Sequence, residues 1–173
     1  QHSHFCEYIS HPSQARRIVT KAAQAALTKK GVAVVIVNGD MFTESDDDEM
    51  DWAVYRPQPV SRPSDAEMAE LAALVDAAGK VTVYAGIGAR DARDEIIAFC
   101  EKVKAPMVHT TRAKEFLEPN NPYNVGVNGI LGNKAGVEAL EAADLVISLG
   151  CDFAYTQYYP DGKKIAQIDI DPT

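Results

Sequence analysis

The chain has 173 residues, of which 46% are hydrophobic and 24% charged, and its formal net charge is -8 at pH 7. This length and composition fit one globular domain, or one domain plus a piece of another, with a sizeable core. The acidic balance argues against a nucleic-acid-binding surface, which needs clustered Lys and Arg side chains to neutralise phosphates. Cys6, Cys100 and Cys151 are too widely spaced to indicate a disulfide framework or a zinc site, so a reducing cytoplasm is expected. The longest strongly apolar run, Val32–Val37, is far too short to cross a bilayer.

Residues 1–40 carry one helix pattern and one clear strand pattern. Residues 12–30 place apolar side chains at a helical period, and Gly31 follows where a left-handed C-terminal residue is expected. The run Val32–Val37 is continuous and β-branched, which is typical of a strand buried on both faces of a parallel sheet. Phe5–Ile9 is a further candidate strand. Two strands and a helix cannot close a core, so we expect this piece to belong to a domain that is mostly missing, both chain ends being cuts through a longer protein.

Residues 41–63 lack a periodic pattern. Acidic residues crowd between Glu44 and Asp51, and Pro57, Pro59 and Pro63 follow in an extended run that is incompatible with a helix. We interpret this stretch as an acidic and Pro-rich linker.

From Ser64 onward, helix and strand patterns alternate. Ser64 and Glu67 form a capping-box pattern, in which each side chain accepts a hydrogen bond from a free backbone N–H group, so a helix is expected to begin there and to end at Gly79. The further predicted elements are a strand Val81–Ala85, a helix Ala89–Lys104 with Ala92, Ile96, Phe99, Cys100 and Val103 facing inward, a strand Pro106–His109, a helix Lys134–Ala143, and strands Leu145–Leu149 and Lys164–Ile168. Between these units, Val108–Gly136 is rich in turn formers. The alternation predicts an α/β fold, a Rossmann-like open parallel sheet with helices on both faces, plus a partial α/β segment at the N-terminus.

Each predicted strand of this second unit ends in residues that suit a ligand. In an open parallel sheet, ligands bind beyond the carboxyl ends of the strands, where helix N-termini present free N–H groups. The candidates, strand by strand, are Gly86, Ile87, Gly88 and Ala89; His109, Thr110, Thr111 and Arg112; Gly150, Cys151 and Asp152; and Asp169, Ile170 and Asp171. Together they predict one nucleotide crevice.

The glycines at the first of these strand ends give an ambiguous signal. Gly86 and Gly88 would let a backbone approach a pyrophosphate, but Asp91 stands at the third position of the NAD fingerprint, so a simple tight turn is an open alternative. At the last strand end, the Asp169 carboxylate could accept hydrogen bonds from ribose hydroxyl groups.

The second strand end combines hydroxyl groups with a planar cation. Thr110–Arg112 could bind phosphate oxygens, the alternative being a salt bridge from the arginine to Glu115 or Glu118. His109 is interpreted as a structural imidazole at the end of its strand. The sequence shows no metal-ligand spacing, nucleophile elbow or Walker lysine, so we expect the chain to bind a ligand rather than to catalyse with its own side chains.

Three sequence pieces occur together in an order that resembles a known family. KAPMVHTTRAKEFLEPNNPYNVGVNGILG, AADLVISLGCDFAYTQYYP and KKIAQIDIDPT are similar to the central domain of thiamine-diphosphate-dependent pyruvate oxidases and pyruvate:quinone oxidoreductases, and more distantly to acetolactate synthases. The resemblance covers 64–173, and residues 4–40 are similar to the end of the family's pyrimidine-binding domain. It implies three parts: the C-terminal remnant of that domain at 1–40, the linker at 41–63, and a truncated central nucleotide-binding domain at 64–173.

The resemblance implies FAD as the cofactor of this central domain. Carried over by position, the residues would be Gly86, Ile87 and Gly88 at the dinucleotide, Thr110, Thr111 and Arg112 at its phosphates or ribityl chain, Val127, Asn128 and Gly129 on the flavin side, Gly150, Cys151 and Asp152 on the next loop, and Asp169 and Ile170 at the adenosine. No catalytic or metal-binding residue is expected in the chain.

For the full-length protein, the resemblance implies oxidative decarboxylation of pyruvate to acetate with quinone as electron acceptor. Thiamine diphosphate and Mg²⁺ would bind at sites outside this chain, which alone is expected to be inactive. A cytoplasmic homotetramer is expected, with peripheral contact at the inner membrane face through other segments as a further option. The alternatives are the central domain of an acetolactate synthase-like carboligase and a stand-alone module that binds NAD or ADP without catalysis.

Overall fold

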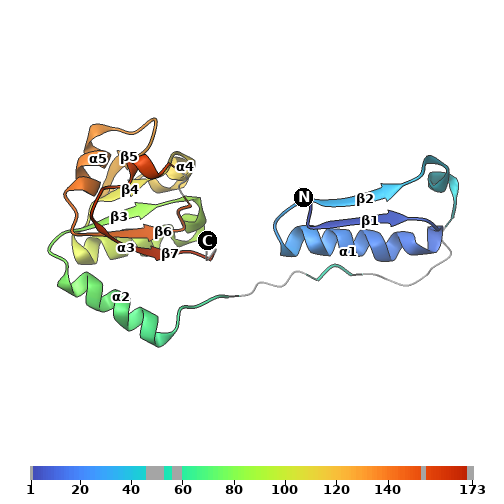
Figure 1. Cartoon of the computed structure of the whole chain (residues 1–173), viewed down its shortest axis with the longest axis horizontal. Coiled ribbons are helices and arrows are strands. Elements are labelled where there is room, and N and C mark those ends of the chain that lie inside the picture. The colour runs from blue at the N-terminus through green and yellow to red at the C-terminus, as the bar shows by residue number, and fades with distance from the viewer. Residues whose placement is uncertain (1, 46–52, 56–59, 153–154, 171–173) are drawn as a thin grey trace. The chain divides into compact units, whose positions relative to one another are not determined.

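The computed structural model describes residues 2–45, 53–55, 60–152 and 155–170, and the chain divides into two compact units, Gln1–Val60 and Ser61–Thr173 (Figure 1). We call them the N-terminal unit and the C-terminal unit and describe each by itself. Residues 46–52 and 56–59 of the linker expected at 41–63 lie outside the described residues. The predicted ligand residue Asp171 also lies outside them.

The N-terminal unit is a parallel pair of strands packed against one helix. Its elements are β1 (Phe5–Ile9), a 3-10 turn η1 (Pro12–Gln14), α1 (Ala15–Thr28), β2 (Ala33–Val37) and a second 3-10 turn η2 (Gly39–Thr43). The strands pair in register from Phe5 opposite Ala33 to Ile9 opposite Val37. Ile18 and Ala22 of α1 are buried against the pair. The candidate strand Phe5–Ile9 is therefore present.

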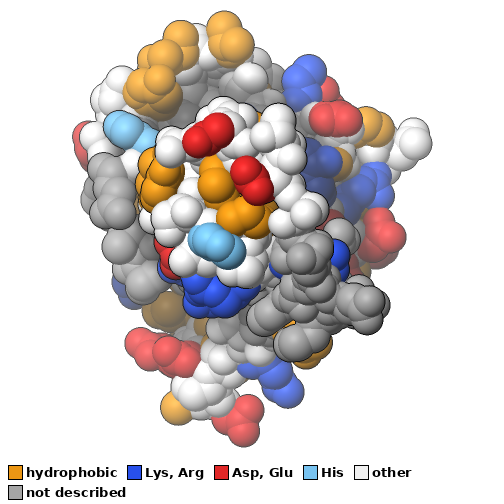
Figure 2. All heavy atoms as spheres, turned by 90° about the vertical axis from the view of Figure 1, so that its right-hand side faces the viewer, with side chains coloured by type: hydrophobic (Ala, Val, Ile, Leu, Met, Phe, Trp, Pro, Cys, Tyr) orange, Lys and Arg blue, Asp and Glu red, His pale blue; other side chains and the backbone are white. Residues whose placement is uncertain are grey.

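One sequence prediction for this unit was wrong. The left-handed residue after α1 is Lys30, with φ 49°, rather than Gly31. Within this chain the second strand is exposed on one face: Val34 and Ile36 are 37% and 47% exposed, and Tyr8, which pairs with Ile36, is 45% exposed. Because α1 covers only one face of the pair, the other face presents apolar side chains to solvent. Hydrophobic side chains are visible at the surface in Figure 2.

The C-terminal unit contains a five-stranded parallel sheet in the order β5-β4-β3-β6-β7. Its strands are β3 (Val81–Ala85), β4 (Met107–His109), β5 (Asn124–Val127), β6 (Leu145–Leu149) and β7 (Lys164–Ile168). β3 is buried along its whole length and β6 at all but its last residue, as continuous apolar runs predict for central parallel strands. The α/β class and the parallel sheet predicted from the sequence are confirmed.

Helices cover both faces of this sheet (Figure 1). They are α2 (Asp65–Ala77), α3 (Arg93–Val103), the single turn α4 (Lys114–Leu117) and α5 (Lys134–Glu141), with 3-10 turns η3 (Ile87–Ala92), η4 (Thr111–Ala113) and η5 (Thr156–Tyr158). One core layer joins Val83, Met107 and Ile147 to Ile96 and Cys100 of α3 and to inward side chains of α2. The other joins alternate strand residues, such as Tyr84, to Leu140 of α5.

The capping box at α2 is confirmed in detail. Ser64 Oγ accepts from the Glu67 N–H group at 3.2 Å, and the Glu67 carboxylate accepts from the Ser64 N–H group at 2.7 Å. The Ser64 hydroxyl also donates to the Glu67 carboxylate at 2.8 Å, and the hydrogen bonds from the Ser64 N–H and hydroxyl groups hold the pKa of this carboxyl below its usual range. No residue of α2 is buried, however, although Leu71 and Leu74 pack partly against the core.

Other elements differ from the sequence prediction. The helix expected at 89–104 begins as η3 and becomes α-helical only at Arg93, and Ala92, expected to face inward, is exposed. β5 and α4 were not predicted. Both lie in the turn-rich stretch Val108–Gly136, and β5 contains Gly126 at φ 122°, which a strand pattern does not anticipate.

Candidate functional site

The strand order places the predicted ligand residues along one edge of the sheet. Because all five strands are parallel, their carboxyl ends meet at this edge. In spatial order, the predicted residues there are Val127–Gly129 at the end of β5, Thr110–Arg112 after β4, Gly86–Gly88 after β3, Gly150–Asp152 after β6 and Asp169–Ile170 after β7. Four gaps between neighbouring strands span about 19 Å. The neighbours β3 and β6 form the point at which the strand order reverses, which is where open parallel sheets bind ligands.

The loops after β3 and β6 pack directly on each other through glycines. Gly86 N–H donates to Leu149 O and Gly88 N–H donates to Gly150 O, each at 2.9 Å. A Cβ on Gly86 would lie 2.3 Å from Gly150 O. Gly150 has φ 53°, and a Cβ there would lie 2.5 Å from the Ala89 nitrogen. The glycines are therefore required for the contact between the loops, and the N–H groups of Gly86 and Gly88 are engaged within the domain instead of facing a pyrophosphate.

A cleft of about 670 Å³ opens beside this contact, between α2, η3 and the ends of β6 and β7. We call it the α2 cleft. Five predicted ligand residues line it: Gly88, Ala89, Gly150, Asp169 and Ile170. The other described candidates do not line it.

The α2 side of the cleft was not anticipated from the sequence. Met68, Leu71 and Leu74 of α2 line the cleft, as do Arg62 just before the helix and Gln167 on β7. The apolar face of α2 is only partly covered, since Met68 is exposed and Leu71 and Leu74 are half-buried. Its incomplete burial is what leaves an apolar wall facing the cleft.

The charged residues that line the α2 cleft are mostly acidic. Arg62 is the one cation among the lining residues, against the carboxylates of Glu67, Glu70 and Asp169. The Glu67 carboxylate is occupied by the cap of α2. This balance favours a ligand portion with hydroxyl or amino donors over a phosphate.

The loop after β4 presents its cation to solvent. Thr110 is buried and its N–H group donates to Ala85 O at 3.0 Å, whereas Thr111 and Arg112 are exposed. Among the described residues, Glu118 pairs with Lys114 rather than with Arg112, and this contact lowers the pKa of the Glu118 carboxyl. The alternative of a salt bridge from Arg112 to Glu115 or Glu118 is therefore not observed.

Some of the residues expected on the flavin side form hydrogen bonds within the domain. Asn128 is buried, its N–H group donates to His109 O at 3.1 Å and its side-chain amide donates to Tyr158 O at 2.9 Å. Gly129 has φ 116° and begins a tight turn, in which Gly132 N–H donates to Gly129 O at 2.7 Å. The side chains within this turn, Ile130 and Leu131, are 67% and 72% exposed.

Cys151 belongs to the core rather than to a ligand surface. It is 2% exposed, and burial raises the pKa of its thiol to about 11. It lies in the layer of Tyr84, whose ring meets the ring of Tyr159 edge to face at 5.8 Å. Asp152, the next residue, is exposed.

Within the described ranges, no group of three or more His, Cys, Asp or Glu side chains could hold a metal ion. Across the same part of the chain, no helix is long and apolar enough to span a bilayer.

Comparison with known proteins relates the chain to larger enzymes. The most informative relatives are an uncharacterized 42.6 kDa protein of Pseudomonas amyloderamosa, 41% identical over 98% of this chain and 43% of the relative, and two named enzymes. The 3D-(3,5/4)-trihydroxycyclohexane-1,2-dione hydrolase of Bacillus subtilis is 29% identical over 96% of this chain and 27% of the relative. The pyruvate oxidase of Lactiplantibacillus plantarum is 28% identical over 90% of this chain and 27% of the relative. The chain thus spans less than half the length of each.

A solved structure and a family model agree on the fold. The crystal structure of benzoylformate decarboxylase from Polynucleobacter necessarius matches 98% of this chain and 33% of its own with a TM-score of 0.72, at 20% identity. Residues 68–173 match the family model described as the thiamine pyrophosphate enzyme central domain. This chain therefore belongs to the thiamine pyrophosphate enzymes and contains their central domain.

Proposed function

We propose that the C-terminal unit holds the adenosine half of FAD in the α2 cleft, as part of a larger thiamine-diphosphate-dependent enzyme. The observation that carries this proposal is the position of the cleft. It opens at the carboxyl ends of β6 and β7, beside the reversal point between β3 and β6, where open parallel sheets bind nucleotides. Its volume of about 670 Å³ also lies in the range typical of small-molecule sites.

The lining of the cleft fits an adenosine. Met68, Leu71 and Leu74 provide an apolar wall for the adenine ring, and the Asp169 carboxylate can accept hydrogen bonds from ribose hydroxyl groups. The acidic balance of the lining disfavours the diphosphate inside the cleft. We therefore place it further along the sheet edge, towards the exposed Thr111 and Arg112.

The remainder of the cofactor would extend along the edge towards β5. The edge spans about 19 Å, which suits an extended dinucleotide. Bound FAD would supply an electron acceptor, and the residues of this chain would bind and orient it. Thiamine diphosphate and Mg²⁺ are proposed to bind at segments of the full-length protein outside this chain.

For the full-length protein we propose oxidative decarboxylation of pyruvate to acetate with quinone as acceptor. The motif order described above and the similarity to a pyruvate oxidase support this reaction. A second candidate is hydrolysis of a cyclic 1,2-dione, which the similarity to the B. subtilis hydrolase favours. Full-length protein supplied with thiamine diphosphate, Mg²⁺ and FAD should reduce a quinone with pyruvate. Ring opening of the dione without quinone reduction would favour the second candidate, and acetolactate formation would favour a carboligase.

The nucleotide site is tested on the chain 1–173 by calorimetric titration with ADP, FAD and NAD. Asp169→Asn should weaken ADP binding by about tenfold or more, because a hydrogen bond to a charged group contributes about 1.5–3 kcal/mol. Asp161→Asn is the matched control, since Asp161 is exposed in the turn before β7 and does not line the cleft. Equal ADP affinities for the two variants would contradict the assignment of the α2 cleft, and a preference for NAD would favour a stand-alone nucleotide module.

A further inference from the structure

The segment that contains the residues proposed to face the diphosphate cannot be stable alone. Thr111 and Arg112 lie in η4, which runs directly into α4, and α4 is a helix of four residues. A single helical turn gains too few hydrogen bonds to offset the entropy of ordering its backbone. The placement of Thr111 and Arg112 must therefore come from contacts with the rest of the domain.

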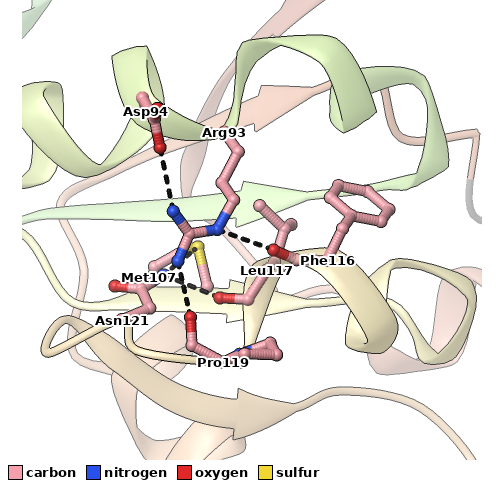
Figure 3. A network of polar contacts seen from close by, with 7 residues as sticks. All are labelled: Arg93, Asp94, Met107, Phe116, Leu117, Pro119 and Asn121. Carbon is pink, nitrogen blue, oxygen red and sulfur yellow. Dashed lines mark hydrogen bonds and ion pairs between the residues drawn. The ribbon is translucent and has the colours of Figure 1, made fainter.

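Arg93 supplies those contacts at the C-terminal end of α4 (Figure 3). Its Nε donates to Phe116 O at 2.9 Å and its Nη2 donates to Pro119 O at 2.5 Å, while Nη1 pairs with Asp94 Oδ1 at 2.8 Å. All three nitrogens of the guanidinium are thus used, and the side chain is only 30% exposed. Backbone carbonyls at the end of a helix attract a cation, and the planar fork of arginine fixes two of them at a set spacing.

The same turn is held at three other points. Leu117 is fully buried, the Asn121 side-chain amide donates to Leu117 O at 2.9 Å, and the Arg90 guanidinium lies 5.2 Å from the centre of the Phe116 ring. On the N-terminal side, Thr110 N–H donates to Ala85 O. Arg90, which lies in η3, and Arg93 both join α4 to a second ligand loop, and Arg93 differs from the other restraints because its guanidinium holds two backbone carbonyl groups.

That second loop is the one after β3. Arg93 is the first residue of α3, and η3, which carries Ile87 and Gly88, ends at the residue before it. Gly88 lines the α2 cleft. The guanidinium therefore bridges the loop beside the adenosine cleft and the loop that presents Arg112.

From this geometry we propose that Arg93 is a positioning residue, which fixes the spacing between the loops after β3 and β4 and thereby places Arg112 to bind a diphosphate. This inference rests on the proposed nucleotide site. Arg93 does not touch the ligand and acts through α4. A lysine at this position would keep the charge but could not hold two carbonyl groups through a rigid fork.

The test uses the chain 1–173 and ADP as the probe, with Arg93→Lys, Arg112→Ala and the double variant. Arg93→Lys should raise the Kd for ADP by about tenfold in the wild-type background and by less than about twofold in the Arg112→Ala background, because its effect passes through Arg112. Lys102→Ala is the control, since Lys102 is exposed in the last turn of α3. An unchanged Kd for Arg93→Lys, or an equal loss in both backgrounds, would overturn the positioning role.

Amide hydrogen exchange separates this inference from the proposed function. The reporter is the Glu118 N–H group, which donates to Lys114 O at 3.2 Å and closes α4. It should exchange faster in Arg93→Lys and at the wild-type rate in Lys102→Ala, whether or not ADP binds. An unchanged exchange rate in Arg93→Lys would overturn the proposal that Arg93 holds α4 in place. If the wild-type chain did not bind ADP but the Glu118 N–H group still exchanged faster in Arg93→Lys, the role of Arg93 at α4 would be supported and the nucleotide site overturned.

Discussion

The close packing of the loops after β3 and β6 predicts that Gly86→Ala lowers the free energy of unfolding. Gly86 has an ordinary extended backbone, with φ -110°, so alanine would cause no conformational strain there. Its Cβ, however, would lie 2.3 Å from Gly150 O and 2.6 Å from Cys151 Cα, whereas real Cβ atoms essentially never come within 3.0 Å of another heavy atom. Both neighbours are backbone atoms, so no side chain can rotate away. The two loops would have to separate by about 0.7 Å.

The expected loss of stability follows from what this separation disturbs. The hydrogen bonds from Gly86 N–H to Leu149 O and from Gly88 N–H to Gly150 O, both 2.9 Å, would lengthen, and each contributes about 0.5–1.5 kcal/mol. Overpacking of a buried position adds about 1–3 kcal/mol. The free energy of unfolding of the C-terminal unit should therefore fall by about 2–6 kcal/mol.

The measurement is native-state amide hydrogen exchange of β3 and β6 in the chain 1–173, because it reports on the C-terminal unit alone. Gly162→Ala is the matched control. Gly162 has φ 68°, but a Cβ there would meet no atom within 4 Å, so only backbone strain of about 1–2 kcal/mol is expected. If Gly86→Ala lowered the stability no more than Gly162→Ala, the direct packing of the two loops would be refuted.

Two further predictions concern the cap of α2 and the thiols. Ser64→Ala should destabilise α2 by about 0.5–2 kcal/mol, measured by exchange of the α2 amides. Because the Ser64 hydrogen bonds lower the pKa of Glu67, the wild-type cap should be complete above the ordinary carboxyl pKa of 4.5 and be lost as pH falls through the lowered value; equal acid sensitivity of Ser64→Ala and wild type would contradict this. Cys6 is exposed and should react with a disulfide reagent in the folded protein, whereas Cys100 and Cys151, whose pKa values burial raises to about 11, should react only on unfolding. Rapid labelling of more than one thiol would refute that burial.

The elements that were predicted correctly from the sequence depend on residues that are close together in the chain. The capping box depends on two side chains three positions apart, and both of its hydrogen bonds are present. The strands β3 and β6 are continuous apolar runs, and such runs are stable only between two covering layers. The alternation of these runs with helical periods was enough to indicate the α/β class.

The elements that were missed depend on distant partners. β5 pairs with β4 through a register shift between Met107 and Val108, and it is held from the other side by the Asn133 amide, which donates to Val125 O at 3.1 Å. α4 depends on Arg93, which precedes the carbonyl groups it holds by 23 and 26 residues. Neither restraint leaves a periodic pattern in the sequence.

At the candidate site too, some features follow from the local sequence and others only from tertiary contacts. The sequence alone determined the class of the fold, the cap of α2 and the strand ends at which ligand residues stand, because backbone propensity and side-chain period are properties of neighbouring residues. Only the tertiary structure decided that Gly86 and Gly88 engage their N–H groups with the loop of Gly150, and that an under-packed α2 leaves a cleft over β6 and β7. Those outcomes depend on which surfaces meet when the chain closes on itself, and a local pattern does not specify that meeting.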